Sequence, residues 1–205
     1  MAEFDIATLN PGEPYKILSS LVVPRPIAWV VTQDIETGTV NVAPFSFFNL
    51  VGSDPPTIAL GVSPVKRSGE SKDTGRNLSE VGTGFVVHLV DEAHAEAMNR
   101  TASELPAHES EAQAADLALA ETVKVSPVPR IATAPAALEC RVAEIARVGN
   151  NRIVLGEVVY VHLSDALWDA EKKYVRTEDA RLIGRMHGGG WYVRTSDRFS
   201  MDRPR

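Results

Sequence analysis

Cysteine is almost absent from this chain: Cys140 is the only one among 205 residues. A single cysteine cannot form an intrachain disulfide, and the N-terminus lacks the basic and apolar regions of a secretory signal. The cytoplasm is therefore the expected compartment.

Long apolar runs and basic clusters are missing as well. The longest apolar run, Leu50 to Ser63, is interrupted by Asp54-Pro55-Pro56 and is shorter than the roughly 20 residues of a membrane span. The formal net charge is -6, and no run of Lys and Arg is long enough for a nucleic-acid or membrane patch. We therefore expect neither nucleic acid nor a membrane as a partner, so any bound anion must be held locally.

Common catalytic and metal-binding patterns are also lacking. The histidines share no close ligand spacing with one another or with Cys140, so no metal site is predicted. No serine has the surroundings of a nucleophile elbow, and no catalytic side chain is predicted. The glycines at 188–190 lack the spacing of a dinucleotide fingerprint, so a nicotinamide would have no nucleotide fold of its own.

The residues that are present favour β-strands. Two runs, Ala137 to Arg147 and Arg152 to Leu163, are separated by Gly149-Asn150-Asn151, which predicts a hairpin. Shorter β-rich runs cover Ile27 to Thr32, Thr57 to Ser63, Gly84 to Val90 and Trp191 to Thr195.

Helices are predicted only from about Asp73 to Val81 and after Asp91, and they do not alternate regularly with the strands. At least six strands with few helices favour a mainly β fold, an antiparallel barrel. We expect a single domain over residues 1–205, with a lead-in at 1–20 and a tail at 196–205.

One strand-like segment, residues 41–49, mixes small, polar and proline residues. Small side chains there would let backbone N–H and C=O groups reach the edge of a flavin ring, and Ser46 adds a hydroxyl. The alternative is an edge strand with Pro44 on its unpaired side and phenylalanines in the core. The candidate cofactor contacts in this segment are Ala43, Pro44, Phe45, Ser46 and Phe47.

A second segment, residues 72–77, places a cation, a hydroxyl and an amide at the start of a predicted helix. Free N–H groups at a helix start attract phosphate, so Lys72 and Thr74 are candidate contacts for the phosphate of a cofactor, with Asn77 nearby. Asp73 would repel a phosphate and is assigned to capping the helix or to orienting Lys72 or Arg76. The alternative is an ordinary capped helix facing solvent.

Two arginines complete the candidate cofactor contacts. Arg25 stands between two prolines, so its side chain projects from a stiff corner, where it can bind the phosphate or close a turn with an acidic partner. Arg185 precedes a glycine run and the aromatic pair Trp191-Tyr192, a segment that can line a ligand pocket or shape a hairpin turn.

In their order and spacing, these segments resemble the flavin reductase-like, FMN-binding split-barrel family. The resemblance covers nearly the whole chain and is carried by Pro24-Arg25-Pro26-Ile27-Ala28, Asn41 to Ser46, Asp54-Pro55-Pro56, Lys72-Asp73-Thr74 with Asn77-Leu78, Gly156-Glu157-Val158 with His162, and Tyr192 to Thr195.

The resemblance implies a six-stranded Greek-key split barrel with short flanking helices, assembled as a homodimer with FMN at or near the subunit interface. It also implies flavin reduction by hydride transfer from NAD(P)H, a transient co-substrate, and a monooxygenase or another redox protein as a further partner. Because no nicotinamide motif is present, a flavoredoxin-like electron carrier is the alternative, and an FMN-free paralogue is a third reading.

Overall fold

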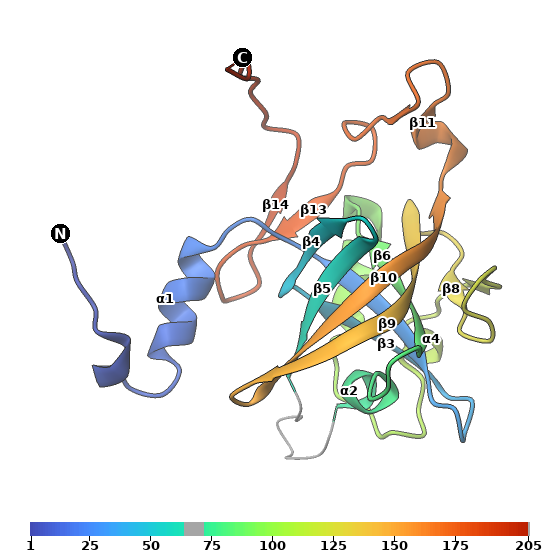
Figure 1. The fold of residues 1–205 in the computed structure, drawn as a ribbon, viewed down its shortest axis with the longest axis horizontal. Coiled ribbons are helices and arrows are strands. Elements are labelled where there is room, and N and C mark those ends of the chain that lie inside the picture. Colours follow the sequence, from blue (N-terminus) through green and yellow to red (C-terminus); the bar gives the residue numbers. More distant parts are fainter. Residues whose placement is uncertain (64–71, 205) are drawn as a thin grey trace.

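The computed structural model describes residues 1–63 and 72–204. Residues 64–71, whose polar sequence with glycine and serine predicts a loop, lie outside the described residues. The fold is mainly β, and its largest element is a seven-stranded antiparallel sheet (Figure 1). Its strands lie in the order β3-β2-β6-β9-β10-β5-β4. They are β2 (Ala28–Gln33), β3 (Val40–Phe45), β4 (Phe48–Ser53), β5 (Pro56–Val62), β6 (Gly84–Leu89), β9 (Ala136–Val148) and β10 (Asn151–Leu163).

The predicted strand count of six is therefore one too low for this sheet. The predicted runs correspond to β2, β5, β6, β9 and β10 and, outside this sheet, to β14 (Tyr192–Arg194), and β3 lies largely in the strand-like segment 41–49. β4 was missed because most of its residues are exposed and show no alternation of apolar and polar side chains.

Shorter elements surround the sheet. The helices are η1 (Ile6–Thr8), α1 (Glu13–Leu21), α2 (Asp73–Asn77), η2 (Glu92–His94), α3 (Ala95–Arg100), α4 (Glu111–Ala114) and η3 (Asp165–Leu167). The small sheets pair β1 (Arg25–Pro26) with β13 (Ile183–Arg185) and β14 (Tyr192–Arg194), β7 (Leu119–Ala120) with β8 (Arg130–Ile131), and β11 (Trp168–Asp169) with β12 (Tyr174–Val175).

The helices differ from the expectations in two places. α2 ends at Asn77, before the predicted end at Val81. α1, which was not predicted, lies mostly in the lead-in and extends away from the barrel (Figure 1). Within the described part of the chain, no helix is long and apolar enough to cross a membrane.

The two edge strands of the sheet, β3 and β4, follow one another in the chain but do not pair with each other. Ser46 and Phe47 alone connect them, so the chain passes from one edge of the sheet to the other there. The barrel is therefore split at this corner, where edge backbone groups are left for other partners.

A glycine allows the strands to approach closely beside the split. The N–H of Gly61 on β5 donates a hydrogen bond to the carbonyl of Phe47 at 2.7 Å. A Cβ at position 61 would lie 2.8 Å from the Cβ of Phe47, so a larger residue would push the connection away.

Buried side chains pack on both faces of the sheet. Inside the barrel, Cys140 and Val142, which alternate along β9 and so share one face, pack with Val30, Phe85 and their neighbours. On the other face, Trp29 and Val86 pack under α3, α4 and the segment from 117 to 134. Burial raises the pKa of the Cys140 thiol, so this cysteine is a core residue and not a nucleophile.

Two buried polar side chains attach the segment 117–134 to the outer face of the sheet. The carboxylate of Glu139 on β9, 0% exposed, accepts hydrogen bonds from the backbone N–H groups of Val123, Lys124 and Val125. Burial opposes its charge, but these bonds and His162 hold the pKa of Glu139 below its usual value.

His88 on β6 makes the second attachment. Its Nδ1 lies 3.0 Å from the carbonyl of Trp29, and its Nε2 accepts a hydrogen bond from the N–H of Ile131 at 2.9 Å. The carbonyl can only accept and the N–H can only donate, so the ring must be neutral, with its proton on Nδ1. Burial lowers the pKa of His88 to about 4.

Stability is therefore expected to depend on pH through His88. The folded state holds fewer protons than the unfolded chain between the folded pKa of about 4 and the unfolded value of about 6.5, so stability falls as pH falls through that window. From about pH 7 to about pH 5 this one group should remove about 2 kcal/mol from the free energy of unfolding.

Urea unfolding at both pH values, with the protein concentration held constant, measures the loss. His88→Gln should flatten the pH dependence, whereas His108→Gln, whose imidazole is 82% exposed, should leave it unchanged. An equally steep dependence in His88→Gln would contradict the assignment.

Candidate functional site

A cavity of about 230 Å³ lies beside the exposed edge of β3. It is lined by Ala43, Pro44 and Phe45 of β3 and by Lys72 and Thr74 at the start of α2. The two sequence segments predicted to contact a cofactor therefore meet in one place. The loop after α3 and Glu111 of α4 complete the wall.

The edge of β3 directs part of its backbone toward this side. The Val40 carbonyl accepts a hydrogen bond from the Ser110 hydroxyl at 2.6 Å, and the Val42 N–H donates to the Glu111 carboxylate at 3.1 Å. Along an antiparallel strand, the backbone groups of every second residue point to the same side, so the Pro44 carbonyl points away from β2 like the Val40 carbonyl. The N–H that proline lacks would point the same way, so its absence costs no hydrogen bond to β2. Pro44 therefore leaves an acceptor at the cavity.

Polar contacts fix the start of α2 beneath the cavity. The Asn41 side-chain amide donates to the Thr74 hydroxyl at 2.8 Å, and Thr74 is only 2% exposed. Arg152 of β10 donates to the carbonyl of Gly75 at 2.7 Å. Thr74 can still donate its own hydroxyl proton, because it accepts in the bond with Asn41.

The charged residues at the start of α2 differ in whether they have a partner. Lys72 is half-buried at the N-cap position, and no hydrogen bond or ion pair within the described residues holds its ammonium group. Asp73 lies inside the first turn and not at the N-cap position, so the alternative in which it caps the helix is wrong. Asp73 instead pairs with Arg76 at 2.8 Å, which confirms its predicted role in orienting that arginine.

Ser46 and Phe47 border a second cavity, of about 510 Å³, on the far side of the split. Arg25 and the tip of the β9–β10 hairpin, including Val148 and Asn151, also line it. The five candidate residues of the segment 43–47 thus run from one cavity to the other around the corner between β3 and β4.

The guanidinium of Arg25 is committed to backbone carbonyls. It is buried, and its Nη atoms donate to Ser19 at 2.6 Å, to Val22 at 2.9 Å and to Met186 at 2.8 Å. These bonds join α1, β1 and the β13–β14 hairpin. One of the two alternatives for Arg25 was that it closes a turn with an acidic partner. It does close a corner, but its partners are backbone carbonyls. Its contact with a phosphate stays a prediction.

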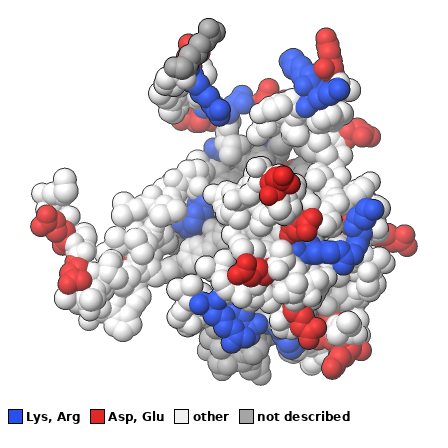
Figure 2. Space-filling view, viewed as in Figure 1, with Lys and Arg blue, Asp and Glu red and all other residues white. Residues whose placement is uncertain are grey.

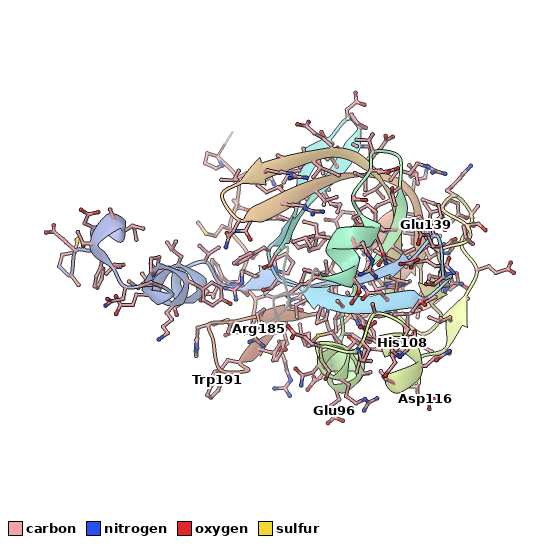
Figure 3. All side chains as sticks on the ribbon, turned by 90° about the horizontal axis from the view of Figure 1, so that it is seen from below. Glu96, His108, Asp116, Glu139, Arg185 and Trp191 are labelled. Carbon is pink, nitrogen blue, oxygen red and sulfur yellow. The ribbon has the colours of Figure 1, made fainter. Side chains whose placement is uncertain are left out.

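Two candidates lie away from both cavities. Asn77 donates to the Thr32 hydroxyl at 3.0 Å and so attaches α2 to β2. Arg185 stacks on the Tyr192 ring, with its guanidinium carbon 4.8 Å from the ring centroid. Figure 3 shows Arg185 and Trp191 on the side from which α1 extends.

Asn41 and Glu111 line the first cavity but were not among the predicted cofactor contacts. Asn41, Ala43 and Phe45 are at every second position of β3, so their side chains lie on the same face of the strand. This two-residue period is the signal that could have identified Asn41. Glu111 lies 69 positions from Val42, and no local pattern could connect the two.

The chain belongs to the flavin reductase like domain family, whose model matches residues 19–178. An uncharacterized protein of Deinococcus radiodurans is 45% identical over 98% of this chain and 88% of its own. The family resemblance found in the sequence and the mainly β split-barrel fold that it implied are both confirmed.

Two solved structures are similar throughout. Nitrilotriacetate monooxygenase component B from Bacillus cereus is 33% identical, covers 98% of both chains and has a TM-score of 0.89. The 2-nitrobenzoate 2-nitroreductase NbaA of Pseudomonas fluorescens is 35% identical, covers 99% of this chain and 96% of its own, and has a TM-score of 0.87.

The residues around the split fit a flavin nucleotide. A half-buried ammonium and a threonine hydroxyl suit a phosphate, and the edge of β3 with its small and apolar side chains suits a flat heterocycle. We therefore expect Lys72 and Thr74 at the phosphate end and the segment 43–47 along the ring.

Combining Lys72→Ala and Thr74→Ala should weaken FMN binding far more than riboflavin binding, because riboflavin lacks the phosphate. Loss of one charge-assisted hydrogen bond should raise the dissociation constant of FMN about tenfold or more. Fluorescence titration with both flavins measures this, and Lys124→Ala, at an exposed lysine outside the cavity, is the control. Equal losses for the two flavins would disprove the placement.

Proposed function

We propose that this protein binds FMN and uses NAD(P)H to reduce flavin. The observation that supports this most directly is the cavity in which the edge of β3 meets Lys72 and Thr74. Membership of the flavin reductase like domain family supports the same reaction class.

The chain's own residues have binding and positioning roles in this proposal. Bound flavin would supply the redox chemistry by accepting a hydride from the nicotinamide, which needs no side-chain acid. Lys72 and Thr74 hold the phosphate, and the Pro44 carbonyl and its neighbours orient the ring. The nicotinamide nucleotide docks transiently against the exposed flavin face, because the chain has no dinucleotide fingerprint.

Two acceptors are favoured by the similar proteins. The likeness to a monooxygenase component B supports delivery of reduced flavin to a monooxygenase partner. The likeness to a nitroreductase supports reduction of a small organic acceptor. The flavoredoxin-like carrier remains the competing proposal, supported by the missing nicotinamide motif.

The first experiment is the absorption spectrum of purified protein loaded with FMN, recorded under anaerobic conditions before and after NADH and then NADPH. Rapid loss of the oxidised-flavin absorbance with either nucleotide is the expected result. Free FMN at the same concentration without protein is the control. A flavin spectrum that persists with both nucleotides would support the carrier and reject the reductase.

We also propose a homodimer. Large apolar side chains are exposed on α1, on β4 and at the tip of the β9–β10 hairpin, including Leu21 at 71%, Leu50 at 66% and Val148 at 64%. Tyr15 of α1 and Phe47 stack edge to face, and Val22, Phe47 and Val148 line the same cavity, so these elements form one surface beside the split. A second copy covering this apolar surface would also enclose the flavin.

Leu21→Glu or Val148→Glu should therefore turn a dimer into a monomer, because each places a charge in the proposed interface. Size exclusion with light scattering measures the mass. Ile35→Glu is the matched control, since Ile35 is 99% exposed in the distant β2–β3 turn. Wild-type protein that is monomeric at micromolar concentration would rule out the dimer.

A further inference from the structure

A third and larger cavity, of about 700 Å³, lies between the C-terminal end of β10, the β8–β9 connection and the residues of η3. It shares no lining residue with the two cavities beside the split. Figure 3 shows Glu139, which lies under this region, well away from Arg185 and Trp191. The proposed flavin function does not use it.

Arg130 of β8 lines this cavity with an uncompensated charge. Its Nε is buried and has no hydrogen-bond partner. Among the described residues, no carboxylate pairs with its guanidinium and no carbonyl accepts from it. A cation that is partly withdrawn from water without a partner is costly, so a bound anion would stabilise it.

His162 of β10 lines the same cavity, and its ring is hydrogen-bonded to Glu139 of β9. Its Nε2 lies 2.6 Å from the carboxylate of Glu139, which is completely buried and ionised, so Nε2 carries a proton and donates it. No partner is found for Nδ1 among the described residues, and a proton on Nδ1 would make it a second donor toward the cavity.

The acidic residues of the cavity do not cancel these donors. The Asp91 carboxylate is engaged by His94 Nδ1 at 2.6 Å, and His94 Nε2 in turn lies 3.0 Å from the Thr133 hydroxyl. Asp165 and Asp179 are exposed, where water and salt screen their charge. Figure 2 shows how acidic and basic side chains are interspersed over the face that it displays.

We propose that this cavity is a second ligand site, which binds a small anionic molecule by placing its oxyanion head between Arg130 and His162. The shared chemistry is a carboxylate or phosphate group, which a guanidinium fork recognises through paired hydrogen bonds and to which an imidazole N–H adds a further donor. The cavity volume suits a molecule with a body of several carbon atoms beyond the head, resting on Tyr160 and the alanines of the β8–β9 connection.

The experiment titrates FMN-loaded protein with sodium phosphate and, separately, with sodium benzoate, at constant ionic strength by isothermal titration calorimetry. Loading with FMN keeps the phosphate away from Lys72. Arg130→Gln should raise the dissociation constant at least about tenfold, and His162→Gln, which still offers Glu139 a donor, should raise it less. Arg147→Gln, at an exposed arginine near the tip of the same hairpin, should not change it.

Tighter binding of benzoate would identify an organic acid as the ligand class, and tighter binding of phosphate a phosphorylated one. If Arg130→Gln does not fold, as judged by its thermal midpoint, Arg130→Lys should bind with intermediate affinity, because a lysine keeps the charge but loses the fork. Unchanged affinity in the folded Arg130 variants, or no saturable heat with either anion, would overturn the proposal. Both outcomes are independent of whether NADH reduces the bound flavin.

Discussion

The unpaired edges of the sheet are the constraint on which the rest of the molecule depends. β3 and β4 follow one another in the chain, yet they occupy opposite ends of the strand order. Backbone N–H and C=O groups left at such edges must find other partners. The Ser110 hydroxyl donates to the Val40 carbonyl, and the Glu111 carboxylate accepts from the Val42 N–H. Pro44 has no N–H that would need a partner. What remains open at this corner is suited to a flat, polar-edged ligand.

A second set of contacts holds the segment 117–134 against the outer face of the sheet. Glu139 and His88 are buried polar groups that would destabilise the fold if they lacked partners. Their partners are the backbone N–H groups of Val123 to Val125 and of Ile131, so a segment with little regular structure is held in place. The cavity beside Arg130 exists because this segment is fixed there. The same contacts that stabilise the fold thus shape this cavity.

The success of sequence reasoning differed between elements for physical reasons. The long hairpin of β9 and β10 was predictable because alternation and turn residues are local signals, and Gly156 marks a bulge in its register. β4 and α1 were missed because they are mostly exposed, so burial imposed no period on their sequences. Arg25 was recognised as a stiff corner, but its carbonyl partners come from α1 and from Met186, which is 161 positions away.

By itself, the sequence determined the family, the mainly β class and two of the segments that meet at the proposed flavin site, because short motifs and strand periods depend on neighbouring residues alone. Only the tertiary structure decided that the segment 43–47 turns around a split between two cavities, and that Asn77 and Arg185 lie apart from both. It also brought Glu139, His162 and Arg130 to one side of the sheet. These placements depend on strand order and long-range contacts, for which one sequence carries no local signal.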